Sequence, residues 1–129
     1  LPRAGRLQVD ASAGAEDALV ALHGAARGAV QSVKVQAELR DLARMPVLAD
    51  ELSGGDVVVF DPPRSGAREQ AAEIAASDVP LVIAVSCNPT TFARDARTLV
   101  DGGYRLREAT PVDQFPWSGH LELVAVFER

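Results

Sequence analysis

The stretch that decides the fold is "PLVIAVSCNPTTFARDARTLVDGG", residues 80–103. Its first seven residues form an almost unbroken apolar run, which is typical of a buried strand. A helix follows, with Asn88 as its N-cap, Pro89 at the first helical position and Gly102–Gly103 as its stop. The stretch therefore predicts one strand–helix unit of an α/β protein.

The same alternation of strand and helix extends on both sides of this unit. Strands are predicted at 6–9, 32–39, 56–60 and 80–86, and helices at 11–27, 65–77 and 88–101. The run "DVVVF" (56–60) is continuous and β-branched, so we expect it to be buried on both faces. The polar connection before it leaves room for one helical turn.

The C-terminal part changes character. The segments "YRLREATPV" (104–112) and "LELVAVF" (121–127) predict two strands with no helix between them, and hence an antiparallel pair. The chain is therefore predicted to form a single α/β domain, residues 1–129, with a mostly parallel sheet that ends in an antiparallel strand pair.

Composition narrows the class of protein. Of 129 residues, 47% are hydrophobic and 24% charged, as in an ordinary globular domain. The net charge of −5 argues against a self-sufficient nucleic-acid binder, whose affinity would rest on clustered Lys and Arg. No apolar stretch approaches the ~20 residues of a membrane span, and the first residues do not resemble a signal peptide. One cysteine and two histidines offer neither a disulfide framework nor a metal cluster, so we expect a cytoplasmic protein without a metal.

The groups that could perform chemistry follow the strands. In parallel sheets, ligands bind beyond the carboxyl ends of the strands. The groups found there are Asp10, Asp41, Asp61, Cys87 and the loop "VDQFPWSGHLE", residues 112–122. We therefore expect them to lie along one edge of the sheet.

Cys87 has two interpretations. A lone intracellular cysteine is most often a small buried hydrophobe. Yet Cys87 comes just before a helix N-terminus, where free backbone N–H groups and the helix dipole stabilise a thiolate. Position alone leaves both interpretations open.

The acidic candidates are equally ambiguous when taken singly. The segment "DPPR", 61–64, is either a sharp turn capped by Ser65 or a rigid turn that holds the carboxylate of Asp61 toward a planar ligand. Asp10 could accept hydrogen bonds from a ribose or cap a helix, and the latter is the commoner role. Asp41 could contact an adenine amino group or be an ordinary loop residue.

The loop before the last strand concentrates aromatic and polar groups. Phe115 and Trp117 suit stacking on a base, or they could cover the edge of the sheet. His120 is more often a structural hydrogen-bonding residue than a catalyst, and a solvated strand end is the default role of Glu122.

Three segments together make a resemblance. These are "FDPPRSGA" (60–67), "VSCNPTTFARDARTLVDGGYRL" (85–106) and "PVDQFPWSGHLELVAVFER" (111–129). In this order and spacing they resemble the C-terminal motifs of the S-adenosylmethionine-dependent RNA 5-methyluridine methyltransferases, which methylate C5 of uridine in tRNA or rRNA. The resemblance is strong over 56–129 and loose over 6–55. It implies a Rossmann-like class I methyltransferase sheet.

The resemblance also implies a role for each matched residue. Cys87 resembles the nucleophile that adds to C6 of uracil, and Glu122 the general base that removes the C5 proton. Asp61 resembles the residue that contacts the flipped uracil, in a pocket shaped by Pro62. Phe115 is implied as a packing partner of that base.

S-adenosylmethionine is the cofactor that the resemblance implies. Asp10 is similar in position to the acidic residue on the cofactor ribose, and Asp41 to the one near the adenine. Asp61 is implied at the junction of the cofactor and the substrate. No metal is expected at the site.

The sequence departs from the family pattern at its start, which corresponds to about the second strand. We therefore expect the C-terminal portion of a catalytic domain, lacking the first strand, its glycine-rich loop and the RNA-binding parts. An isolated chain of this kind is expected to be inactive and to leave RNA binding to other segments. It should either pair the strand that contains Asp10 directly with 56–60 or form an edge-strand dimer.

Two rival classes of protein fit the sequence less well. A degenerate methyltransferase-like binding or scaffold module would be expected to have lost Cys87, Asp61 or Glu122, and all three are present. An N-methyltransferase would carry an aromatic residue where this sequence has Arg64, and it would need no cysteine. The sequence therefore favours the uracil methyltransferase.

Overall fold

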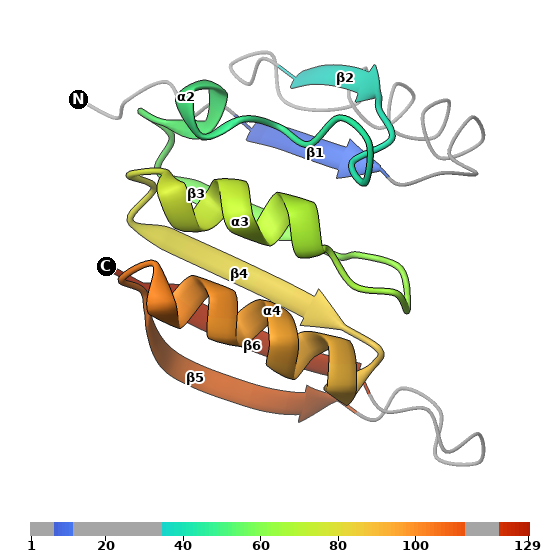
Figure 1. Ribbon diagram of the computed structural model, residues 1–129, viewed down its shortest axis with the longest axis vertical. Coiled ribbons are helices and arrows are strands. Elements are labelled where there is room, and N and C mark those ends of the chain that lie inside the picture. Colours follow the sequence, from blue (N-terminus) through green and yellow to red (C-terminus); the bar gives the residue numbers. More distant parts are fainter. Residues whose placement is uncertain (1–6, 12–34, 113–121) are drawn as a thin grey trace.

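The computed structural model describes residues 7–11, 35–112 and 122–129 of the chain (Figure 1). The described strands form two sheets. In the first, β1 (Leu7–Ala11) pairs in parallel with β2 (Val35–Leu39). The second has the order β3-β4-β6-β5, with β3 at Val57–Phe60, β4 at Leu81–Ser86, β5 at Arg105–Val112 and β6 at Glu122–Glu128. The helix predicted at 11–27 lies outside the described residues.

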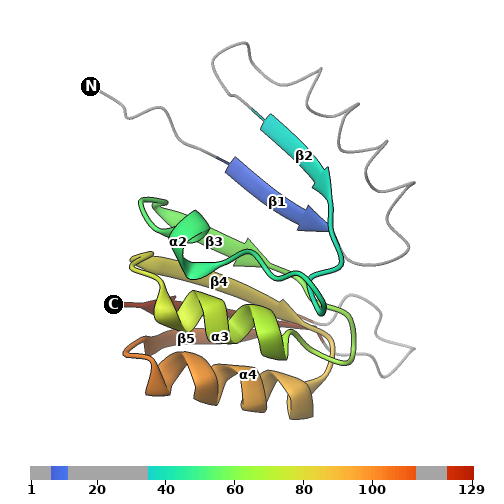
Figure 2. The ribbon, with the colours of Figure 1, turned by 45° about the horizontal axis from the view of Figure 1, so that its top comes forward.

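The second sheet is mixed, as the sequence predicts. Strands β3 and β4 are parallel, and β6 lies between β4 and β5, antiparallel to both. The predicted C-terminal antiparallel pair is therefore confirmed. Strands β1 to β4 all point the same way, so their carboxyl ends share one edge of the molecule (Figure 2).

Three helices accompany the strands: α2 (Ala49–Leu52), α3 (Arg68–Ala76) and α4 (Pro89–Asp101). Helices α3 and α4 cover the same face of the four-stranded sheet (Figure 1). The core between these helices and the sheet consists of Val47, Leu52, Ile74, Val79, Val82, Ala84, Leu99, Tyr104, Ala125 and Phe127. Burial of this apolar surface is the main stabilising term of the fold.

Helix α4 begins as predicted. The side chain of Asn88 accepts a hydrogen bond from the Thr90 amide at 3.1 Å, which satisfies one of the free donors of the first turn. On its buried face, Leu99 is fully buried, whereas Val100 is 40% exposed. The charged residue Asp95 is also buried, at 4% exposed. Asp95 is buried because it accepts a hydrogen bond from the loop that precedes α3.

Helix α3 begins at Arg68, three residues later than the predicted start at 65. Ser65 is not its cap: the N-cap position is Ala67, whose amide donates to Asp95 at 2.7 Å. Gly66 has φ +81°, a left-handed conformation that interrupts a helix. The loop is therefore fixed by α4 and not by a local cap.

The prediction that 56–60 is buried on both faces is wrong. Val58 and Phe60 pack against the core, but Val57 and Val59 are 43% and 47% exposed. Helices α3 and α4 lie on one face of the sheet, and these two valines are on the other face.

Of the two alternatives expected for the strand that contains Asp10, direct pairing with 56–60 is wrong. Strand β1 lies beside β3, but no ladder hydrogen bonds join them. The link from β2 to β3 is held by α3, since the buried side chain of Gln70 bonds both the N–H and the carbonyl of Val47, at 2.9 and 3.0 Å. These two hydrogen bonds hold the segment between β2 and β3 against α3. They do not bring β1 into hydrogen-bonding register with β3.

Candidate functional site

Three of the predicted site residues lie at the carboxyl-terminal edge of the parallel strands. Asp61 directly follows β3, and Cys87 directly follows the neighbouring strand β4. Glu122 is the first residue of β6. The β4–β6 ladder ends at the pair Ser86↔Leu123, so Cys87 and Glu122 each directly adjoin the last pair of this ladder. The topology thus brings together a thiol and two carboxylates that are far apart in sequence.

The turn that carries Cys87 is held on both sides. The hydroxyl of Ser86 donates to the Asn88 carbonyl at 3.1 Å, and the Asn88 amide donates to Ser86 Oγ at 3.2 Å. Ser86 is itself buried, whereas the free thiol of Cys87 is half-buried. Cys87 therefore lies past the strand, on a defined turn at the edge of the core. This position favours the second interpretation of the cysteine.

Asp61 and Asp41 line one cavity of about 240 Å³. Its apolar wall is made by Leu42, Leu52, Val58, Phe60 and Pro62. Asp41 is exposed, and one of its carboxylate oxygens accepts the Ala43 amide at 3.1 Å, which shapes the turn at the rim. An apolar cavity with carboxylate acceptors suits a flat ring system that carries amino or hydroxyl donors.

The remaining predicted residues are less well placed. Asp10 is the penultimate residue of β1, opposite Glu38, and does not close its strand as expected. It belongs to a different sheet from Asp61. Phe115, Trp117 and the other residues of the loop 113–121 lie outside the described residues.

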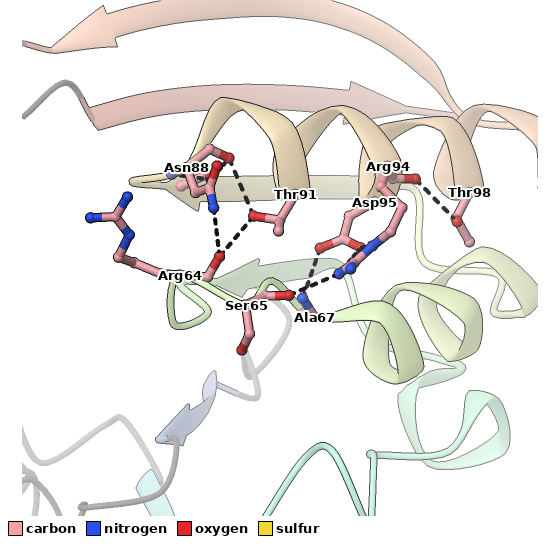
Figure 3. Close-up of polar contacts among 9 residues, drawn as sticks. Arg64, Ser65, Ala67, Asn88, Thr91, Arg94, Asp95 and Thr98 are labelled. Carbon is pink, nitrogen blue, oxygen red and sulfur yellow. Dashed lines mark hydrogen bonds and ion pairs between the residues drawn. The ribbon is translucent and has the colours of Figure 1, made fainter.

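Helix α4 contributes polar residues to this edge that the sequence did not single out (Figure 3). Thr91 Oγ1 donates to the carbonyl of Arg64 at 3.0 Å, and Arg94 Nη2 donates to that of Ser65 at 3.1 Å. Arg94 also forms an ion pair with Asp95 at 3.1 Å. The only available signal was the helical spacing of these residues, which does not identify their partners.

Within the described parts of the chain, no group of His, Cys, Asp and Glu could hold a metal ion. None of the helices described is long and apolar enough to cross a membrane.

The strand order, the helix layer and the polar groups beyond the strand ends define a Rossmann-like methyltransferase domain. A solved structure supports this assignment: the Pyrococcus abyssi tRNA (uracil-54, C5)-methyltransferase, in complex with S-adenosyl-L-homocysteine, superposes with a TM-score of 0.75 at 29% identity. The family model for tRNA (uracil-5-)-methyltransferases matches residues 25–129. The chain belongs to this tRNA (uracil-5-)-methyltransferase family.

Curated relatives agree with this family. A protein of Caulobacter vibrioides, named an uncharacterized RNA methyltransferase, is 56% identical over 99% of this chain. A protein of Mesorhizobium japonicum with a similar name is 51% identical over 98% of the chain. The chain spans 31% of the length of each of these two relatives. The match to the Pyrococcus abyssi structure includes 95% of this chain and 28% of that one.

Proposed function

We propose that the protein containing this chain transfers a methyl group from S-adenosylmethionine to C5 of a uridine in tRNA or rRNA. The observation that carries the proposal is that Cys87 and Glu122 both adjoin the last pair of the β4–β6 ladder, while Asp61 follows the neighbouring strand β3. Methylation of uracil at C5 needs a nucleophile and a base that both reach the same uracil ring. Cys87 and Glu122 supply these two groups from adjacent strands.

In this mechanism Cys87 acts first. Its thiolate forms a bond to C6 of a uracil that has been flipped out of the RNA stack, and the electrons of the C5–C6 double bond move toward C5 and the C4 carbonyl oxygen. Asp61 orients the ring in the pocket bounded by Pro62. C5 then takes up the methyl group. Glu122 removes the C5 proton, and the electrons of that C–H bond reform the C5–C6 double bond and expel Cys87 as thiolate.

The described residues fit the adenosine part of the proposed cofactor. The apolar cavity next to β3 would accept the base, with Asp41 as an acceptor for its amino group. Asp61 lines the same cavity, and Asp10 would accept hydrogen bonds from the ribose hydroxyls. When bound, S-adenosylmethionine supplies an electrophilic methyl group on its sulfonium. These carboxylates would orient it, and they take no part in the transfer.

The test uses the full-length protein and RNA that contains 5-fluorouridine. Fluorine at C5 cannot leave as a proton does, so the methylated covalent adduct should accumulate and run as a shifted band on a denaturing gel. Cys87→Ala should abolish the band, and methyl transfer to ordinary RNA should fall to background. An adduct that persists in Cys87→Ala would refute the assignment of the nucleophile. Absence of any adduct with the unmodified protein would favour a binding or scaffold module.

We further propose that the 129-residue chain alone does not catalyse this reaction. Asp10 and Asp61 belong to sheets that no ladder joins, so their spacing is not set by backbone hydrogen bonds. Titration calorimetry of the isolated chain with S-adenosylmethionine should show no saturable binding in the micromolar range. Saturable micromolar heat would contradict the proposal.

A further inference from the structure

We propose that helix α4 is a positioning element for the reaction, because it locks the loop that bears Asp61 to the turn that bears Cys87. The contacts are made by Asn88, Thr91, Arg94 and Asp95 with the backbone of residues 64–67; this set of contacts is called the α4 clamp (Figure 3). Its catalytic meaning rests on the proposed function, and its geometry rests on the hydrogen bonds between these side chains and the loop.

The loop needs such support. Pro62 and Pro63 have no backbone N–H, so this part of the loop cannot donate hydrogen bonds of its own. Within the loop, the Gly66 amide donates to the Pro63 carbonyl at 2.8 Å. Three further backbone groups of the loop are bonded to side chains of α4 and its N-cap: the carbonyls of Arg64 and Ser65 and the amide of Ala67.

Asn88 connects the two segments that the clamp holds together. Its Oδ1 accepts from the Thr90 amide at 3.1 Å, and its Nδ2 donates to the Arg64 carbonyl at 2.9 Å. The same residue is bonded through its backbone to Ser86, which encloses Cys87 between two fixed neighbours. One side chain therefore caps α4 and ties the turn of Cys87 to the loop of Asp61.

The clamp extends along one face of the helix. Thr91 and Arg94 follow Asn88 at intervals of three residues, which places them on the same side of α4. Thr91 Oγ1 shares the Arg64 carbonyl with Asn88, so two donors fix one oxygen. Asp95, 4% exposed, accepts the Ala67 amide at 2.7 Å and is neutralised by Arg94. A buried carboxylate of this kind is tolerated because both its charge and its hydrogen bonding are satisfied.

The consequence concerns the rate of attack. Two consecutive prolines make the path from Asp61 to Arg64 stiff, so fixing the Arg64 carbonyl restricts where the Asp61 carboxylate can lie. Small displacements of positioned groups lower reaction rates by large factors. We therefore expect the solvent-exposed bonds of the clamp, from Asn88 and Thr91 to the Arg64 carbonyl, to act on the formation of the Cys87 adduct and to have little effect on RNA affinity or on folding.

The test combines two substitutions in the full-length protein, Asn88→Ser and Thr91→Val. Serine is as good an N-cap as asparagine but lacks the amide donor, and valine has the shape of threonine without its hydroxyl. The Arg64 carbonyl loses both donors, yet water can replace them because these bonds are solvent-exposed. The matched control is Thr90→Val on the same turn, at an exposed side chain.

Four readouts are measured: the rate of adduct formation with 5-fluorouridine RNA, the KM for RNA, the thermal midpoint of unfolding, and hydrogen exchange of the 64–67 amides. The double variant should form the adduct about 10- to 100-fold more slowly, with KM and the thermal midpoint unchanged and exchange faster at 64–67. Asn88→Ser with Thr91→Ser, which restores one hydroxyl, should recover part of the rate.

The outcomes separate the two proposals. If the unmodified protein forms a Cys87 adduct and the double variant forms it equally fast, the positioning role is refuted. If the unmodified protein forms no adduct, the proposed function fails. Hydrogen exchange then decides the clamp by itself, and unchanged exchange at 64–67 in the double variant would refute it.

Discussion

Cys87 lies one residue beyond the last ladder pair of β4, on a turn at the edge of the core. Ala84 and Ser86 are buried toward the helices, whereas Cys87 follows them as a half-buried residue on a turn. A cysteine at either of those two positions would be a packing residue. At the residue scale, this position past the end of the strand supports the proposal that Cys87 is the nucleophile.

The role of Glu122 leads to a prediction at the same scale. If this carboxylate removes the C5 proton, Glu122→Gln should permit attack and methylation but block the release of Cys87. A covalent protein–RNA adduct should then accumulate with ordinary uridine RNA, and turnover should fall about 100-fold or more. Mass spectrometry of the adduct, with Cys87→Ala as the control, measures this. Full turnover by Glu122→Gln would show that another group is the base.

At the scale of elements, α4 has two functions on two faces. Phe92, Ala96 and Leu99 pack on the sheet, and the Phe92 ring lies 6.4 Å from that of Phe127. A second face carries the α4 clamp. Because the same helix serves both, the position of the loop at 64–67 is coupled to the packing of the core.

Gly66 is the point at which this coupling is tightest. A Cβ at this position would lie 2.5 Å from Arg94 Nη2 and 2.9 Å from Asp95 Oδ2, and φ is +81°. We expect Gly66→Ala to lower the free energy of unfolding by more than about 1 kcal/mol, as measured by urea denaturation. Gly54→Ala is the matched control, because φ there is +89° but nothing lies within 4 Å. Equal losses in the two variants would show that backbone strain alone matters.

The β5–β6 pair carries a pH-dependent contact far from the candidate site. Arg105 is opposite Glu128 in the ladder and donates a hydrogen bond to its carboxylate. This bond, with the charges of Arg105 and Arg107, lowers the pKa of Glu128 below its ordinary value of 4.5.

Because the folded state lowers this pKa, the contact stabilises the fold above the ordinary value, and that contribution disappears as pH falls through the lowered pKa. Glu128→Gln should therefore reduce stability modestly near neutral pH and have no effect in strong acid. Urea denaturation over this pH range tests the prediction. A stability difference that stays constant with pH would contradict it.

At the scale of the whole molecule, the two edges of the four-stranded sheet differ. Strand β5 carries Arg105, Arg107, Glu108 and Pro111, residues that discourage pairing with another chain. Strand β3 has the sequence VVVF, with no charge, and no ladder on the side that faces β1. An uncharged edge of this kind is expected to accept a further strand.

The isolated chain should therefore associate through β3, as an edge-strand dimer would. Sedimentation at increasing concentration should show dimers or larger species, and Val59→Lys should reduce them by placing a charge on this edge. Leu106→Lys is the control, since Leu106 is similarly exposed but lies on the protected strand β5. Circular dichroism checks that both variants stay folded. A strictly monomeric isolated chain would contradict the prediction.

Much of the fold could be predicted because its signals are local. The cap at Asn88 and the antiparallel partners of the C-terminal part are encoded within a few residues of where they act. The edge that gathers Asp61, Cys87 and Glu122 was also predictable, because parallel strands present their carboxyl ends on one side. The start of α3 was missed because the amide of its N-cap residue, Ala67, is bonded to Asp95, which lies 28 residues further along the chain.

The sequence by itself thus determined the order of strands and helices and the residue types at the ends of the strands. Only the tertiary structure decided that Asp95 is buried, that Val59 is exposed and that α4 clamps the loop of Asp61. The physical reason is that burial and side-chain hydrogen bonds depend on what packs alongside. In this chain, those neighbours come from elements that are two dozen or more residues apart.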